Sequence, residues 1–271
     1  MTDALPLLYE KTDGIVLITL NRPAARNAIS PEVACRLADA FASVAEDPEV
    51  RVVILRGAGD KAFCSGGDLG LTLPLMTGAR QPDTVWDHRL LNDPAVMDRS
   101  ALRGFELNKP IIAAVNGHCM AGGMETLLAT DIRIAADHAT FALPEVRRGL
   151  IPFAGALVRL PRQIPQCLAM EMLLTGDMIG AEQAREAGLI NRVVAADLLM
   201  DTVWDIARRI AANGPIAVQE IKRTVLQASG VTLEQGYLLE DAAKARVMAS
   251  ADAREGPRAF MEKRPAVFQG N

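Results

Sequence analysis

Two glutamates and two glycine-rich turns are the residues of this 271-residue chain whose types and spacing could carry out a reaction. Glu125 lies in the otherwise apolar stretch METLLATD (124–131), and Glu145 follows in FALPEVRRGLIP. Paired carboxylates can divide the roles of general acid and general base between them. One glutamate alone in such a stretch is more often partly exposed or ion-paired. The pair, with each member near a segment of bare backbone, therefore favours chemistry.

The glycine-rich turns are AFCSGGDLG (62–70) and NGHCMAGGMET (116–126). Each follows a predicted strand and leaves backbone N–H groups unhindered, so that two such turns could aim two N–H donors at one oxygen, as in an oxyanion hole. The alternative is that the glycines only allow tight turns. Neither turn matches the spacing of a dinucleotide-binding loop or a P-loop. Asp68 and Asp131, which lie next to these segments, are predicted to be turn or cap residues.

The elements that must position these residues alternate between strands and helices. Ser30 and Pro31 are a good N-cap and first residue for a helix over 30–47. Short β-branched runs bounded by turns predict buried strands, and the alternation predicts an α/β chain with covered sheets. We predict strands over 14–23, 50–57, 110–117 and 190–194, two short strands within 132–146, and helices over 124–131 and 180–190, the last with Gly188 at its C-cap.

After about residue 195 only helical periodicity remains, so we predict a mixed core over 1–195 and a helical region over 196–271. The least regular part is 71–105, which contains Pro74, Gly78, Pro82 and Pro94. A long irregular stretch in a compact domain is often a functional loop or lid. A solvated insertion is the other interpretation.

The composition excludes several classes of protein. Half of the residues are hydrophobic, 23% are charged, and the net charge is −4 without a basic stripe, which disfavours nucleic acid as a partner. The four cysteines show no C-x-x-C spacing and indicate reduced thiols in a cytoplasmic compartment. The three histidines show no metal-ligand spacing. The N-terminus does not look like a signal peptide, and no apolar run could span a membrane.

Six stretches of the sequence together resemble the enoyl-CoA hydratase/isomerase, or crotonase, superfamily, over nearly the whole chain apart from 71–105. The resemblance implies a spiral of ββα turns with a C-terminal helical region that builds homotrimers, often paired into hexamers, and caps the site of a neighbouring subunit. The stretches are ITLNRPAARNAIS, VVILRGAGDKAFCSGGDL, KPIIAAVNGHCMAGGMETLLATDIRIAADHATFALPEVRRGLIP, LVRLPRQI, EMLLTGDMIGAEQAREAGLINRVV and EGPRAFMEKRPAVF.

The same resemblance implies an activity. The substrate would be an acyl-CoA thioester, with no cofactor besides the coenzyme A that belongs to the substrate. The N–H groups of Gly67 and Gly122 would hold the thioester oxygen as it becomes an enolate. Glu125 would chiefly activate water and Glu145 would deliver a proton to Cα, in a reversible syn hydration of a trans-2-enoyl-CoA. Isomerisation of the double bond, another crotonase-type acyl-CoA reaction, or acyl-CoA binding without catalysis are the alternatives.

The coenzyme A site is also carried over from the resemblance. Arg26 matches a contact to the phosphates, whereas Ala28, Ser65 and Leu69 match positions along the adenine and pantetheine path. Two positions of the tail resemble residues that reach the coenzyme A of a neighbouring subunit. Phe153 and Ala121 stand at two positions where the family often has glycine. Phe153 would reshape the acyl pocket. The tail residues are Phe260 and Lys263.

Overall fold

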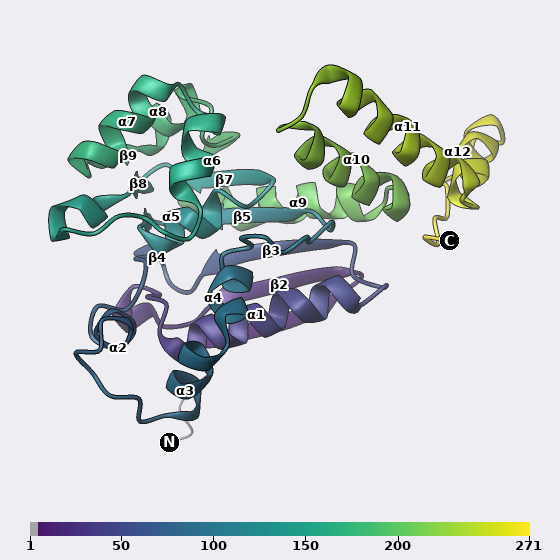
Figure 1. The fold of residues 1–271 in the computed structure, drawn as a ribbon. Helices are drawn as coiled ribbons and strands as arrows, with labels where there is room; N and C mark the ends of the chain where they lie inside the picture. Colours follow the sequence, from purple (N-terminus) through teal and green to yellow (C-terminus); the bar gives the residue numbers. More distant parts are fainter. Residues whose placement is uncertain (1–4) are drawn as a thin grey trace.

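A computed structural model describes residues 5–271 and contains two sheets (Figure 1). The larger sheet has the order β1-β2-β3-β5-β7-β10, in which β1 is antiparallel to β2 and all other neighbours are parallel. The mixed α/β architecture predicted from the sequence is confirmed. The strands of this sheet are β1 (Leu7–Thr12), β2 (Ile15–Leu20), β3 (Val52–Gly57), β5 (Ile111–Val115), β7 (Ile132–Ala136) and β10 (Arg192–Val194).

The smaller sheet runs β4-β6-β8-β9, with β4, β6 and β8 parallel and β9 antiparallel to β8. Each long strand β3, β5 and β7 is followed in the chain by one short strand of this second sheet. The chain therefore spirals, and each turn adds one strand to each sheet. The short strands are β4 (Ala62–Cys64), β6 (His118–Met120), β8 (Thr140–Ala142) and β9 (Ile179–Gly180).

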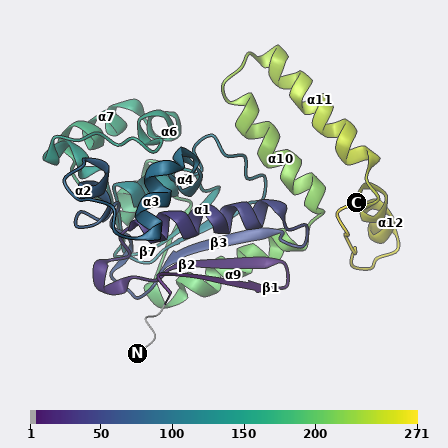
Figure 2. The same cartoon turned by 60° about the horizontal axis from the view of Figure 1, so that its bottom comes forward.

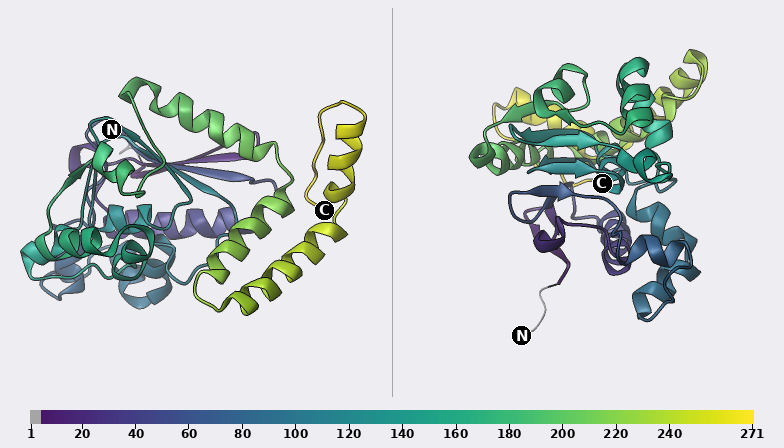
Figure 3. Two further views of the ribbon diagram at one scale, coloured as in Figure 1. Left: turned by 90° about the horizontal axis from the view of Figure 1, so that it is seen from above. Right: turned by 90° about the vertical axis from the view of Figure 1, so that its left-hand side faces the viewer.

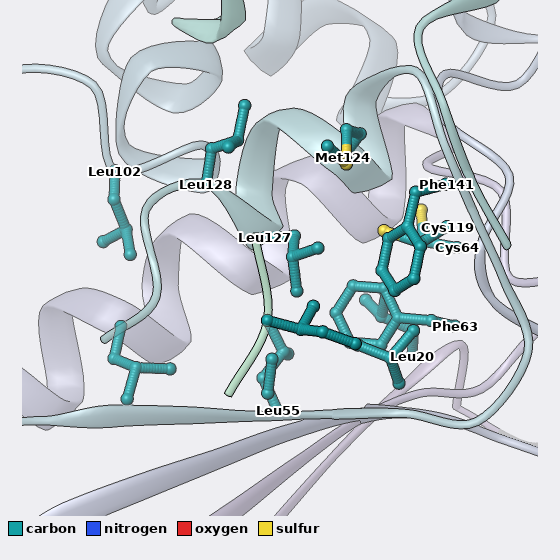
Figure 4. Close-up of a cluster of buried hydrophobic side chains, with 14 of the residues drawn as sticks. Leu20, Leu55, Phe63, Cys64, Leu102, Cys119, Met124, Leu127, Leu128 and Phe141 are labelled. Carbon is teal, nitrogen blue, oxygen red and sulfur yellow. The ribbon is translucent and has the colours of Figure 1, made fainter. Parts of the chain in front are cut away.

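Both faces of the larger sheet are covered, which explains why its strands are continuous apolar runs. Val53 and Leu55 of β3 point into the main core, whereas Val52 and Ile54 point to the opposite face, because successive side chains of a strand alternate. Between the two sheets lies a fully buried cluster that includes Phe63, Cys64, Cys119, Phe141 and Leu127 (Figure 4).

Two long helices cover the two faces of the larger sheet. Helix α1 (Pro31–Glu46) begins as predicted, since Ser30 accepts a hydrogen bond from the Val33 N–H and Pro31 is its first residue. It buries Leu37 and Phe41 in the main core. Helix α9 (Leu199–Ala211) covers the opposite face with Leu199, Val203 and Ile206 (Figure 2). The end of the strands near residue 195 is therefore not the end of the packed core.

The prediction that 71–105 is irregular is wrong. This segment forms α2 (Thr72–Met76), α3 (Val85–Asn92) and α4 (Pro94–Ser100). Its prolines do not break helices, because Pro94 is the first residue of α4 and Pro74 lies in the first turn of α2, where no backbone donor is needed. Thr84 and Asp87 form a capping box for α3.

Helices α10 (Pro215–Ala228), α11 (Leu233–Ala249) and α12 (Asp252–Met261) follow one another along an arc at one end of the molecule (Figure 3). Lys222 ties α10 to the core, since its Nζ donates to Asp131 Oδ2 at 2.7 Å and to the Lys109 carbonyl at 2.9 Å. Asp131 also accepts from the Ile111 N–H, which confirms its predicted structural role. No helix of the described residues is long and apolar enough to cross a membrane.

The remaining elements complete the spiral. Helix α5 begins two residues earlier than predicted, at Gly122, because the glycine turn itself enters the helix. Helix α8 ends with Ala187 as its C-cap, and Gly188 takes the left-handed conformation one residue later. These elements are α5 (Gly122–Leu127), α6 (Ala156–Gln163), α7 (Gln166–Thr175), α8 (Ala181–Glu186) and the 3₁₀ turns η1 (Pro23–Ala25), η2 (Pro144–Arg148) and η3 (Ala196–Leu198).

If α9 is part of the core, Leu199→Ala should lower the free energy of unfolding by about 2 to 5 kcal/mol, since it removes a buried leucine side chain. Leu198→Ala is the matched control, because Leu198 is 53% exposed and its loss should change the free energy by about 0.5 kcal/mol or less. Urea denaturation of both variants measures this. Equal effects of the two changes would contradict the assignment of α9 to the core.

Candidate active site

The candidate site forms where three parallel strands of the smaller sheet end together. Gly67 follows β4, Gly122 follows β6 and Glu145 follows β8. Register pairs Cys64 with Cys119 across β4 and β6, and the same sheet continues into β8. Because parallel strands present their carboxyl ends at one edge, residues far apart in the sequence meet there.

The N–H groups of Gly67 and Gly122 face the same space. A Cβ atom placed on Gly122 would lie 3.5 Å from the Gly67 nitrogen, and one placed on Gly67 would meet no other described atom within 4 Å. Among residues 5–271, neither N–H donates to a backbone carbonyl or to a side chain. Two free donors next to an open space can bind one oxygen atom that gains negative charge.

The two turns come this close because their backbones touch. A Cβ on Gly66, whose φ is +94°, would lie 2.6 Å from Ala121 Cβ, and one on Gly123 would lie 2.5 Å from the Cys64 carbonyl oxygen. Ala121 itself has φ +49°, an uncommon conformation for a residue with a side chain. Backbone strain of this kind persists where the surroundings enforce it, and it occurs often at functional sites.

Glu125 is only 3% exposed, and its carboxylate is held by backbone donors. The Oε1 atom accepts from the Ala154 N–H at 2.5 Å and from the Ala156 N–H at 3.4 Å. Burial raises the pKa of Glu125, and these two N–H groups oppose that rise because they favour the charged form. The segment that enters α6 thus fixes the position of this carboxylate.

Glu145 lies in η2 and has a different environment. Its Oε2 atom is buried and finds no hydrogen-bond partner within the described chain. The pKa of Glu145 is raised to about 7, chiefly by burial and also by the negative charge of Glu125, while its own backbone N–H and Arg148 oppose the rise. Below that pH the carboxyl carries a proton. The pocket therefore holds one carboxylate that accepts hydrogen bonds and one carboxyl that can donate a proton.

Both glutamates and both glycines line a single cavity of about 250 Å³. Ser65, Leu69 and Phe153 line it too, so that seven of the eleven predicted site residues share one space. Phe153 directly precedes Ala154, whose N–H binds Glu125, and the residue is 47% exposed.

The other four predicted site residues do not line this cavity. Arg26 is exposed and Ala28 is buried in the loop after β2. This loop runs beside the first glycine turn, because Ser65 donates to the Arg26 carbonyl and Ile29 donates to the Gly66 carbonyl. Phe260 and Lys263 are exposed at the far end of the molecule, on and just after α12 (Figure 2).

Asp68 shapes the first glycine turn, as predicted. Its Oδ1 accepts from the Gly70 and Leu71 N–H groups, and its Oδ2 pairs with Arg22 at 2.7 Å. No group of three or more His, Cys, Asp or Glu side chains within residues 5–271 could hold a metal ion.

Sequence patterns missed several residues of the site. Leu73, Met76 and Met97 come from the helices of 71–105 and form an apolar wall of the cavity. Arg159 of α6 is half-buried and donates to the Ala101 carbonyl at 3.0 Å, thereby fixing that wall against α6. The only sequence signal for this wall is the helical spacing of its apolar residues. No local sequence pattern distinguishes Arg159 from an ordinary surface arginine.

Comparison with known proteins shows similarity along nearly the whole chain. The model of the enoyl-CoA hydratase/isomerase family matches residues 10–271. Among relatives, the enoyl-CoA hydratase EchA19 of Mycobacterium tuberculosis is 40% identical (97% of this chain and 96% of the relative). The (E)-benzylidenesuccinyl-CoA hydratase of Thauera aromatica is 37% identical (98% and 100%), and the carnitinyl-CoA dehydratase of Proteus mirabilis is 38% identical (97% and 98%).

Solved structures agree with the sequence relatives. An enoyl-CoA hydratase from Bacillus anthracis superimposes with a TM-score of 0.89 at 36% identity, covering 98% of this chain and 100% of that one. The enoyl-CoA hydratase EchA1 from Mycobacterium marinum gives 0.86 at 37% identity, covering 99% and 100%. The spiral fold expected from the sequence is confirmed.

In the ligand-free protein, the Glu145 carboxyl should titrate near pH 7, whereas an ordinary glutamate titrates near 4.3. Glu125→Gln should lower this midpoint, because it removes the neighbouring negative charge. ¹³C NMR of carboxyl-labelled protein measures both values, and Glu145→Gln identifies the signal. A midpoint near the ordinary value, or one that Glu125→Gln leaves unchanged, would refute the described electrostatics.

Proposed function

The chain belongs to the enoyl-CoA hydratase/isomerase family, and we propose that it adds water reversibly to the double bond of a trans-2-enoyl-CoA thioester. The observation that supports this most is the pair of glutamates in one cavity with two different hydrogen-bonding environments. Hydration needs a base for the water and an acid for Cα. Glu125 with its two N–H donors suits the first task, and Glu145 with a pKa of about 7 suits the second.

The thioester oxygen would sit between the Gly67 and Gly122 N–H groups. As water adds to Cβ, electrons move onto this oxygen and form an enolate, which the two donors stabilise more strongly than the neutral carbonyl. The donors need no rearrangement for this, because the two strand ends already hold them close together.

The proton transfers then follow from the positions of the glutamates. Glu125 takes a proton from the attacking water while the water oxygen forms the bond to Cβ. The enolate collapses and Cα takes a proton from Glu145, so that H and OH have added across the double bond. Transfer of the proton from Glu125 back to Glu145 through solvent restores both groups. Dehydration of a 3-hydroxyacyl-CoA runs the same steps in reverse.

The names of the relatives support this reaction class. A hydratase of enoyl-CoA, a hydratase of benzylidenesuccinyl-CoA and a dehydratase of carnitinyl-CoA share a CoA thioester and the addition or removal of water. Their acyl groups differ. The residues around the acyl end, including Phe153 and the wall from 71–105, are therefore the ones that we expect to set the substrate.

For the coenzyme A portion we propose the opening beside Ser65 and Leu69, with Arg26 and Ala28 on the adjoining loop. Phe260 and Lys263 lie on and just after α12, at the opposite end of the molecule from α2, which lines the cavity (Figure 2). In a homotrimer, or a hexamer of two trimers, they would serve the site of another subunit. The four cysteines are free thiols, three of them buried, which suits the cytoplasm.

Glu125→Gln and Glu145→Gln should each lower kcat by about 100-fold or more, since each removes one proton-transfer group. The assay follows loss of the conjugated enoyl-thioester absorbance with trans-2-enoyl-CoAs of increasing length, and mass analysis of the product. A gain of one water is expected. A product of unchanged mass with a moved double bond would replace hydration by isomerisation, and full activity of either variant would refute the acid and base roles of the two glutamates.

Gly122→Ala should also lower kcat by about 100-fold or more, because its methyl group would sit 3.5 Å from the Gly67 nitrogen, where the oxygen must bind. The fold should survive, since this Cβ meets its neighbours only at ordinary contact distance and Gly122 needs no left-handed backbone. Gly180→Ala, at a glycine with open space around it, is the control. Circular dichroism checks folding, and normal turnover by Gly122→Ala would exclude an oxyanion site between the two turns.

A further inference from the structure

The lining of the catalytic cavity contains one cation. Glu125, Glu145 and Arg148 are its charged residues, and most of the rest is apolar, as in Leu73 and Met97. We propose that Arg148 binds a carboxylate at the far end of the acyl group, so that the preferred substrates are enoyl-CoA thioesters of dicarboxylic acids. This inference rests on the proposed function and specifies its substrate class.

Arg148 is free to take such a ligand. Within residues 5–271 no carboxylate forms an ion pair with it, and its one hydrogen bond, from Nη1 to the Pro144 carbonyl, is 3.5 Å long. Its neighbour Arg147 is already engaged, since Nε donates to the Thr175 carbonyl at 2.8 Å and the guanidinium pairs with Asp177. Of these two consecutive arginines, Arg147 is engaged with the end of α7, whereas Arg148 is exposed and lines the cavity.

The backbone fixes Arg148 relative to the reacting groups. It is the last residue of η2, which Glu145 shares, and the Leu150 N–H donates to the Glu145 carbonyl at 3.1 Å to close the turn. Gly149 follows in the left-handed conformation, with φ +68°. The turn therefore holds the backbone of Arg148 three residues from Glu145, and Arg148 lines the cavity together with Leu150 and Phe153.

The charge balance of the cavity favours an anionic acyl end. A carboxylate that enters a cavity lined by two glutamates needs a compensating cation, and among the lining residues Arg148 supplies it. Arg148 lowers the pKa of Glu145. A bound carboxylate would offset this influence and favour the protonated form of Glu145, which is the form that delivers the proton. Substrate binding and acid catalysis would then act in the same direction.

Binding of non-reacting analogues tests the inference without turnover. Calorimetry should measure the Kd of adipyl-CoA and glutaryl-CoA against hexanoyl-CoA and pentanoyl-CoA, which have the same numbers of carbons. We expect at least one carboxylated analogue to bind about tenfold more tightly than its partner, because charge-assisted hydrogen bonds to a partly solvated arginine are of this strength. Arg148→Gln should abolish the difference, and Arg148→Lys should retain part of it.

Arg147→Gln is the matched control, since it removes the same charge one residue away but leaves the cavity lining intact. It should keep the wild-type preference. Equal binding of both analogue classes by the wild type, or a preference that survives Arg148→Gln, would overturn the proposal.

Turnover separates this inference from the proposed function. The ratio of kcat/KM for ω-carboxy trans-2-enoyl-CoAs to that for neutral ones should fall about tenfold in Arg148→Gln. Hydration of neutral chains without any preference for a carboxylate would refute the inference and leave the function standing. Absence of hydration with every substrate would refute the function, and the analogue Kd values would still decide the role of Arg148.

Discussion

Direct contact between backbones at the ends of β4 and β6 is the constraint on which the site depends. Gly66 and Gly123 leave no room for a side chain, so the two turns approach until the Gly67 and Gly122 N–H groups share one space. The parallel register of the short strands fixes this approach, and the buried aromatic and sulfur-containing side chains between the sheets hold the strands in place. The positive φ of Ala121 is a local cost of the same contact.

The two glutamates have different surroundings because backbone N–H donors reach the carboxylate of Glu125 but not the Oε2 atom of Glu145. The entrance to α6 places two N–H groups on Glu125, whereas the buried Oε2 atom of Glu145 has no partner among the described residues. One spiral thus gives two identical side chains different surroundings, because environment rather than residue type sets each pKa.

Sequence patterns were sufficient for elements whose signals are local. The apolar runs predicted β2, β3 and β5, and the Ser30–Pro31 pair predicted the start of α1. The residues of the cavity came from motifs that resemble a known family, and the structure brings seven of them together. The helices of 71–105 were missed because their prolines read as breakers, and the N–H partners of Glu125 because they lie about thirty residues away in the chain. Such tertiary contacts leave no local pattern.

The placement of α9 has a consequence for how the chain folds as it is synthesised. Strands from β2 to β7 can pair in the order in which they emerge, because each joins the free edge of the growing sheet. The face that carries Ile15, Val52 and Ile54 stays bare until α9, at residues 199–211 of 271, has left the ribosome. During that interval the nascent chain exposes an apolar surface that invites aggregation or chaperone binding. Closure of this face by α9 would then be the late step that commits the spiral to its native form.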